Sequence, residues 1–126
     1  FGTATTFCAL LPSGEYLGGA ICPGIGISAE ALFQKTAKLP RIELLPPKKA
    51  ICGNTVSAMR AGIMYGYYGL IKEIVAQMKE ELGGDAFVIA TGGFANTMTQ
   101  ATDCIDVVDS MLTLEGLRII FDKNKR

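Results

Sequence analysis

A β-favouring run of threonines and apolar residues opens the chain, and apolar residues with a helical period follow further on. Residues 3–11 and 15–22 have the composition of strands and flank a Pro-Ser-Gly turn, which predicts a β-hairpin. Ser28 is a good N-cap, and the apolar series that follows it predicts a short amphipathic helix that Pro40 stops. The proline- and lysine-containing segment 41–52 then predicts an exposed connector.

The longest helical period covers residues 56–82. Asn54 and Thr55 cap its start, and the pair Gly83-Gly84 ends it. Apolar residues recur every three or four positions and predict one buried face. These residues are Val56, Met59, Ile63, Tyr67, Leu70, Ile74 and Met78.

Small residues form a second stripe on the same helix, because Ala58, Gly62 and Gly66 are spaced four apart and Gly69 follows. Each interior glycine costs a helix up to about 1 kcal/mol relative to alanine, so a compensating contact is expected. We predict that another helix packs closely against this stripe, either within the chain or across a dimer.

Beyond the double glycine, short strands alternate with helices. The fully apolar run 87–90 predicts a strand buried on both faces, followed by a Thr-Gly-Gly turn and a short helix through Ala101. Residues 105–108 predict another strand, and a final helix begins at Thr113. The order of elements, with glycine turns after the strands, predicts an α/β sheet with helices packed on it.

The composition is that of one folded domain. The 126 residues are 49% hydrophobic and 19% charged, and lysine plus arginine equal aspartate plus glutamate at 12 each. The net charge therefore gives no overall electrostatic attraction to nucleic acid or to an anionic membrane. No apolar run reaches the length of a membrane span. The absence of histidine excludes His-based metal sites and catalytic triads. Four scattered cysteines without a CxxC pair predict reduced thiols and a cytoplasmic location.

Two glycine-bearing turns are candidate phosphate sites. In the opening run FGTATT, Gly2 allows close approach and Thr3 begins a row of hydroxyls, although a threonine-rich edge strand has the same pattern. Gly92 and Gly93 stand between a strand and a helix, an arrangement that binds anions but is common in α/β proteins. The glycines within 18–26 fit either close approach to a ligand or second chain, or simple loops.

Seven segments, in order and over nearly the whole chain, together resemble the C-terminal half of type III pantothenate kinases. They are FGTATT, GGAICPGIGISAEAL, TAKLPRIE, GNTVSAM, AGIMYGYYG, VIATGG and IDVVDSMLTLEGL. The resemblance implies one domain over residues 1–126, a ribonuclease H-like domain of the acetate kinase, sugar kinase, Hsp70 and actin superfamily. It also implies a fragment from which the N-terminal half of the enzyme is absent.

The resemblance further implies an activity. Members of this family transfer the γ-phosphoryl group of ATP to pantothenate, giving 4'-phosphopantothenate in the first step of coenzyme A biosynthesis. They are typically cytoplasmic homodimers that need a divalent cation, Mg²⁺ with ATP, and a monovalent cation, K⁺ or NH₄⁺. By itself, this fragment is expected to be inactive.

The matched motifs also imply site residues. The resemblance assigns Gly2 and Thr3 of the GTATT run, and Gly92 and Gly93 of the TGG turn, to ATP binding. It assigns Thr55 of the GNT motif to pantothenate, in a pocket completed across the dimer. It places the monovalent-cation aspartate just before the first residue and the catalytic aspartate further upstream, after a GxDR motif. No catalytic or metal-ligating residue is therefore expected in this chain.

Some residues depart from the family pattern or lie outside it. Many relatives carry aspartate at the position of Cys8, which leaves a metal-linked role for this position undecided, and Cys8 is not expected to be catalytic. Asp85, Asp103, Asp106 and Asp109 are expected to be solvated loop residues or caps.

Two other functions stay open at this point. One is a non-enzymatic transcriptional accessory relative of the same family, which would have lost the glycine turns that this chain retains. The other is a kinase of the same superfamily that acts on a sugar or on acetate. The neutral net charge argues against direct DNA binding.

Overall fold

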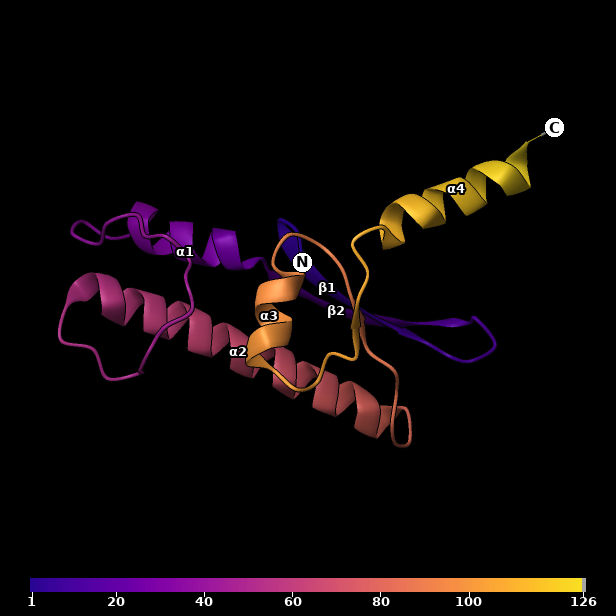
Figure 1. Ribbon diagram of the computed structural model, residues 1–126, viewed down its shortest axis with the longest axis horizontal. Helices are drawn as coiled ribbons and strands as arrows, with labels where there is room; N and C mark the ends of the chain where they lie inside the picture. The colour runs from indigo at the N-terminus through magenta and orange to yellow at the C-terminus, as the bar shows by residue number, and fades with distance from the viewer. Residues whose placement is uncertain (126) are drawn as a thin grey trace.

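A computed structural model describes residues 1–125, which combine four helices with two small sheets (Figure 1). The elements in chain order are β1 (Ala4–Leu10), β2 (Tyr16–Pro23), α1 (Ile25–Gln34), α2 (Thr55–Glu81), β3 (Ile89–Ala90), α3 (Ala95–Ala101), β4 (Val107–Val108) and α4 (Leu112–Asn124). In Figure 1, α1 lies beside the N-terminal half of α2, whereas α4 extends away from the other elements. The predicted mixed α/β class is confirmed.

The predicted hairpin is confirmed. β1 and β2 pair antiparallel, with Thr6 opposite Ile21 and Cys8 opposite Gly19. A side chain at Gly19 has no room, because its Cβ would meet the carbonyl carbon of Phe7 at 2.8 Å. This glycine therefore permits close approach of the chain's own backbone.

Helix α1 differs from its prediction at both ends. It begins at Ile25 after Gly24 and ends at Gln34, and the hydroxyl of Ser28 donates to the carbonyl oxygen of Gly24 at 3.0 Å. Ser28 is therefore within the first turn and does not cap the helix. The start moved because Ile25 is buried in the core, a tertiary contact that the local capping pattern does not encode.

Helix α2 has the predicted ends to within one residue. The side chain of Asn54 accepts a hydrogen bond from the main-chain nitrogen of Ser57 at 2.9 Å, so Asn54 alone is the N-cap. Gly83 and Gly84 follow with φ values of 84° and 148°, which stop the helix. Residues 41–52 form the expected connector without helix or strand.

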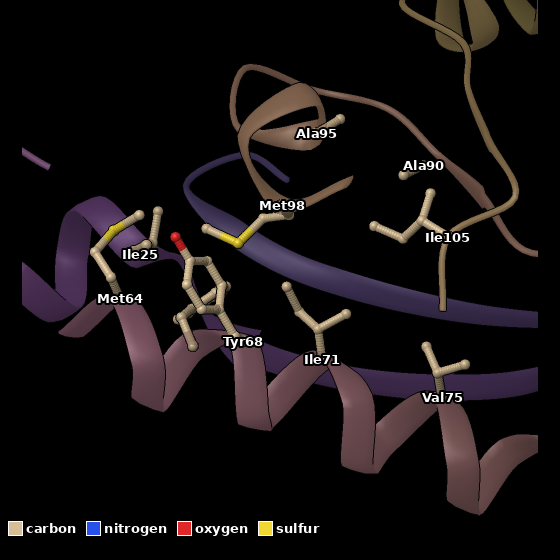
Figure 2. Close-up of a cluster of buried hydrophobic side chains, with 10 residues drawn as sticks. Ile25, Met64, Tyr68, Ile71, Val75, Ala90, Ala95, Met98 and Ile105 are labelled. Carbon is tan, nitrogen blue, oxygen red and sulfur yellow. The ribbon is translucent and has the colours of Figure 1, made fainter. Parts of the chain in front are cut away.

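The buried face of α2 is rotated from the predicted one by about one residue. Met64, Tyr68, Ile71 and Val75 point into the core, where Met98 of α3 packs among them (Figure 2). Of the residues predicted to be buried, Met59 and Tyr67 are, but Val56 is exposed and the others are half-buried. Both faces are apolar, so tertiary packing selects between them, and the buried face is the one in a cluster with Ile25, Met98 and Ile105.

The glycine stripe of α2 lies on the solvent side. Ala58, Gly62, Gly66 and Gly69 are all exposed, and a Cβ built on any of the three glycines meets nothing within 4 Å in the described part of the chain. The prediction of close helix packing within the chain is therefore wrong, and packing across a dimer stays a prediction.

Strands β3 and β4 pair in parallel, with α3 as their connection. One face of this pair packs into the core through Val88, Ala90 and Val108. The prediction that residues 87–90 are buried on both faces is wrong, because Phe87 and Ile89 are exposed. None of the helices within residues 1–125 has the length and apolar character needed to cross a bilayer.

Candidate functional site

The start of the chain lies directly against the Thr-Gly-Gly bend. The nitrogen of Phe1 donates a hydrogen bond to the carbonyl oxygen of Thr91 at 2.9 Å. Gly92 has a φ of 102°, and a Cβ there would meet the carbonyl carbon of Phe1 at 2.8 Å and its nitrogen at 3.0 Å. Both the φ angle and the lack of space require glycine at position 92.

A second glycine, Gly24, contacts the same segment at Thr3. The nitrogen of Gly24 donates to the carbonyl oxygen of Thr3 at 2.9 Å, and a Cβ on Gly24 would meet the carbonyl carbon of Thr3 at 2.8 Å. Residues 1–3 therefore contact Gly92 at their start and Gly24 at their end, and we call these two contacts the clamp. The sequence did not assign a site role to Gly24, although the close-approach interpretation of the glycines within 18–26 contained the signal.

The four predicted ATP-binding residues come together and face solvent. Gly2 and Thr3 lie in the clamped segment, and Gly92 and Gly93 form the bend beside it, all four exposed. A Cβ on Gly93 would meet nothing within 4 Å. The arrangement presents main-chain groups and the Thr3 side chain without bulk, which is the kind of surface that phosphate oxygens bind.

Tyr67 of α2 holds strand β1, which follows directly after Gly2 and Thr3. Its hydroxyl donates to the carbonyl oxygen of Pro23 at 2.9 Å and is also hydrogen-bonded to the hydroxyl of Thr5. Because the carbonyl can only accept, Thr5 is the donor in the second bond. Burial raises the pKa of the Tyr67 hydroxyl, the bond from Thr5 lowers it, and the nearby Cys22 raises it. The sequence identified Tyr67 only as a core residue.

Thr55 is not part of this cluster. It is the first residue of α2 and is exposed, as its predicted place at a helix N-terminus requires. Tyr67, which contacts β1, follows 12 residues later, so about 18 Å of helix separates Thr55 from that contact. Within one chain, the predicted pantothenate residue and the predicted ATP residues are therefore distant.

The aspartates near the parallel strands satisfy main-chain groups, as expected. Asp106 accepts from the nitrogen of Val88 at 2.7 Å, and Asp109 accepts from the nitrogen of Met111 at 2.9 Å. Asp85 and Asp103 are exposed loop residues. The four cysteines of the chain are free thiols, and Cys8 is exposed on β1.

Acidic and thiol side chains, the groups that commonly hold a metal ion, are scattered over the described residues. In the part of the chain that the structure describes, cysteine, aspartate and glutamate side chains nowhere gather in a group of three that could hold a metal ion. A cavity of about 430 Å³ lies between β1, the C-terminal half of α2 and β3, but its lining is mainly apolar. Thr6 and Thr91 line this cavity, and the four predicted ATP residues do not.

Comparison with known proteins identifies the family. The family model for type III pantothenate kinases matches residues 1–77. The chain belongs to this family.

One curated relative and one solved structure are similar to nearly the whole chain. A type III pantothenate kinase of Moorella thermoacetica is 57% identical over 124 residues, which are 98% of this chain and 49% of that protein. The chain therefore spans about half the length of this curated relative. A solved structure from Campylobacter jejuni, described as a Baf family transcriptional activator, has a TM-score of 0.66 and covers 98% of this chain and 55% of its own. Its sequence identity is 24%, so this likeness concerns the fold alone.

Proposed function

We propose that this chain is half of a type III pantothenate kinase that transfers the γ-phosphoryl group of ATP to pantothenate, giving 4'-phosphopantothenate for coenzyme A biosynthesis. The observation that carries the proposal is the clamp at residues 1–3. It brings Phe1, the first residue of the motif that contains Gly2 and Thr3, against Thr91 and Gly92 of another family motif, across 90 positions of sequence.

In the proposed mechanism, this chain positions ATP. The hydroxyl of Thr3 donates to a phosphate oxygen, and main-chain groups at Gly2, Gly92 and Gly93 approach the nucleotide where no side chain intervenes. Phosphoryl transfer depends on positioning and on charge neutralisation more than on covalent chemistry, so such residues suffice for this half. Because these residues offer no metal cluster, we assign the ligands of Mg²⁺ and of K⁺ or NH₄⁺, and the catalytic aspartate, to the unmatched half of the family's chain.

Pantothenate binding is proposed for Thr55. The first turn of a helix has main-chain nitrogens without helical partners and a partial positive charge, which suit a carboxylate substrate. Since α2 separates Thr55 from the ATP residues of its own chain, we propose a homodimer in which Thr55 serves the active site of a second copy. The exposed glycine stripe of α2 offers a smooth face for that dimer.

The proposal includes a ribonuclease H-like fold and a cytoplasmic location. A hairpin followed by a long helix and a parallel pair of strands supports the fold, and four free thiols support the reducing location. The transcriptional accessory function is the weaker proposal, because the candidate phosphate turns are intact and the likeness to the Baf family protein is one of fold.

The test uses a joined protein, in which this chain is fused to the half of the Moorella thermoacetica relative that it does not match. We expect ATP-dependent phosphorylation of pantothenate, and Thr3→Val should raise the KM for ATP at least about tenfold, because a hydrogen bond to a charged group contributes about 1.5 kcal/mol or more. Thr6→Val is the matched control, because Thr6 is an exposed threonine three residues further along the chain, on β1. Phosphorylation of a sugar or acetate but not of pantothenate would replace this function with another.

A further inference from the structure

The hydroxyl of Tyr67 connects helix α2 to both strands of the hairpin. It accepts a hydrogen bond from the hydroxyl of Thr5 on β1 and donates one to the carbonyl oxygen of Pro23 at the end of β2, over separations of 62 and 44 residues. Tyr67 is 4% exposed and Thr5 is 3% exposed, which leaves little access for a water that could replace either partner. A phenylalanine would fill nearly the same space in the core, so the hydroxyl serves these two bonds.

The bond to Pro23 acts directly on the clamp. The carbonyl oxygen of Pro23 and the nitrogen of Gly24 belong to one peptide group, which is planar. Tyr67 donates to the oxygen of this group, and the nitrogen of the same group donates to the carbonyl oxygen of Thr3 at 2.9 Å. Because the group is rigid, the direction of its carbonyl also sets the direction of its N–H. Tyr67 therefore orients the peptide group that contacts Thr3.

The bond from Thr5 restrains the same segment two residues after Thr3. The hydroxyl of Thr5 points into the molecule toward Tyr67, whereas Thr3 is exposed. Main chain joins the two threonines, so the two bonds of Tyr67 and the bond of Gly24 close a ring through Thr3. Breaking one bond of the ring leaves buried polar groups without partners. The position of Thr3 relative to α2 therefore depends on a single hydroxyl.

We propose that Tyr67 is a positioning residue for ATP, which acts through Thr3 without touching the nucleotide. The inference rests on the proposed function, in which the hydroxyl of Thr3 donates to a phosphate oxygen. Tyr67 itself is buried and donates its O–H to Pro23, so it has no proton to offer to a phosphate. Without its hydroxyl, the peptide group at Gly24 can turn and Thr3 can shift. A small displacement of a binding group is enough to weaken the contact that it makes.

The test measures ATP affinity in the joined protein, by titration calorimetry without pantothenate and by steady-state kinetics with both substrates. For Tyr67→Phe we expect the Kd and the KM for ATP to rise about fivefold, which corresponds to the net contribution of one hydrogen bond, and the KM for pantothenate to stay unchanged. Circular dichroism fixes a temperature at which every variant is folded. Tyr68→Phe is the matched control, because Tyr68 is the neighbouring buried tyrosine of α2 (Figure 2) and, within residues 1–125, is bonded to neither Thr5 nor Pro23.

Two substitutions at Thr5 separate positioning from a general loss of packing. Thr5→Ser keeps the donor to Tyr67 and should keep the parent affinity for ATP. Thr5→Val removes the donor from a side chain of nearly the same shape and should raise the Kd for ATP. Since Tyr67→Phe and Thr5→Val break the same bond, the double variant should bind ATP no more weakly than Tyr67→Phe alone.

The opposite results overturn the proposal. Unchanged ATP affinity in Tyr67→Phe, an equal loss in Tyr68→Phe, or losses that multiply in the double variant would each do so. An equal rise in the KM of both substrates would leave Tyr67 with a structural role only. Failure of the proposed function gives a different result, because the joined protein would then bind ATP without phosphorylating pantothenate, and calorimetry would still compare the tyrosine variants. A joined protein that did not bind ATP would overturn both.

Discussion

The nitrogen of Phe1 donates to the carbonyl oxygen of Thr91, and this bond joins two residues 90 positions apart. It exists because Gly92 leaves room for the Phe1 backbone, as Gly24 does for Thr3. The close approach of the first residues to the bend therefore requires these two glycines, in addition to the side-chain contacts that hold β1.

Replacing Gly92 with alanine should separate the strand from the bend. The new Cβ has no space, and the φ of 102° is strained for any residue with a side chain, so we expect a loss of about 2 kcal/mol or more in the free energy of unfolding. Gly93→Ala is the matched control, because its Cβ would meet nothing within 4 Å. Urea denaturation gives the free energy of unfolding of both variants. Equal stability of the two variants would contradict the clamp.

Removing the hydroxyl of Tyr67 should loosen β1 from α2. Tyr67→Phe leaves the carbonyl of Pro23 and the hydroxyl of Thr5 without their partner, which costs about 1–3 kcal/mol for buried groups. Tyr65→Phe, at an exposed tyrosine of the same helix, should change stability little. Thermal and urea unfolding of the two variants should therefore differ clearly.

Stability should also fall in alkaline solution. Burial raises the pKa of Tyr67 and of Tyr68 above the ordinary 10.0, so the folded chain keeps these protons more tightly than the unfolded chain. The stabilisation is complete below pH 10 and is lost as the pH rises through the folded-state pKa values. Urea midpoints measured between pH 8 and pH 11 should show this decline, and Tyr67→Phe should make it shallower. An identical slope in the variant would mean that Tyr67 does not contribute.

Thr55→Ala in the joined protein should act on pantothenate and not on ATP. We expect a rise of about tenfold in the KM for pantothenate with the KM for ATP unchanged, because the proposal assigns Thr55 a contact with pantothenate and none with ATP. Steady-state kinetics with each substrate varied in turn gives both constants. If the KM for pantothenate did not change, the assignment of Thr55 would be wrong.

Substitutions in the α2 stripe should separate helix stability from dimer packing. Gly66→Ala fills open space and should stabilise the 126-residue chain by up to about 1 kcal/mol. In the joined protein, the larger Gly66→Leu should dissociate the dimer by holding the two helices apart. Analytical ultracentrifugation measures this dissociation. If Gly66→Leu remained a dimer, the glycine stripe of α2 would not be the dimer interface.

Local signals predicted the hairpin, the caps of α2 and the mixed α/β class, because turns and caps depend on neighbouring residues. These signals failed where a contact between residues far apart in the sequence determines where a helix begins or which face it buries. Burial of Ile25 starts α1 before Ser28, and packing of Met98 turns α2 toward Met64 and Tyr68 rather than the predicted face. The site shows the same division. Motif spacing selected Gly92, but the role of Gly24 required knowing where Thr3 lies.

Gly24 is also the residue from which α1 begins, so the clamp has a mechanical consequence. Residues 1–3 are hydrogen-bonded to Thr91 in the bend and to Gly24 at the start of α1, so a shift of their main chain would affect both elements. A displacement of Thr3 would therefore reach the start of α1 through a single hydrogen bond, because no loop separates Gly24 from the helix.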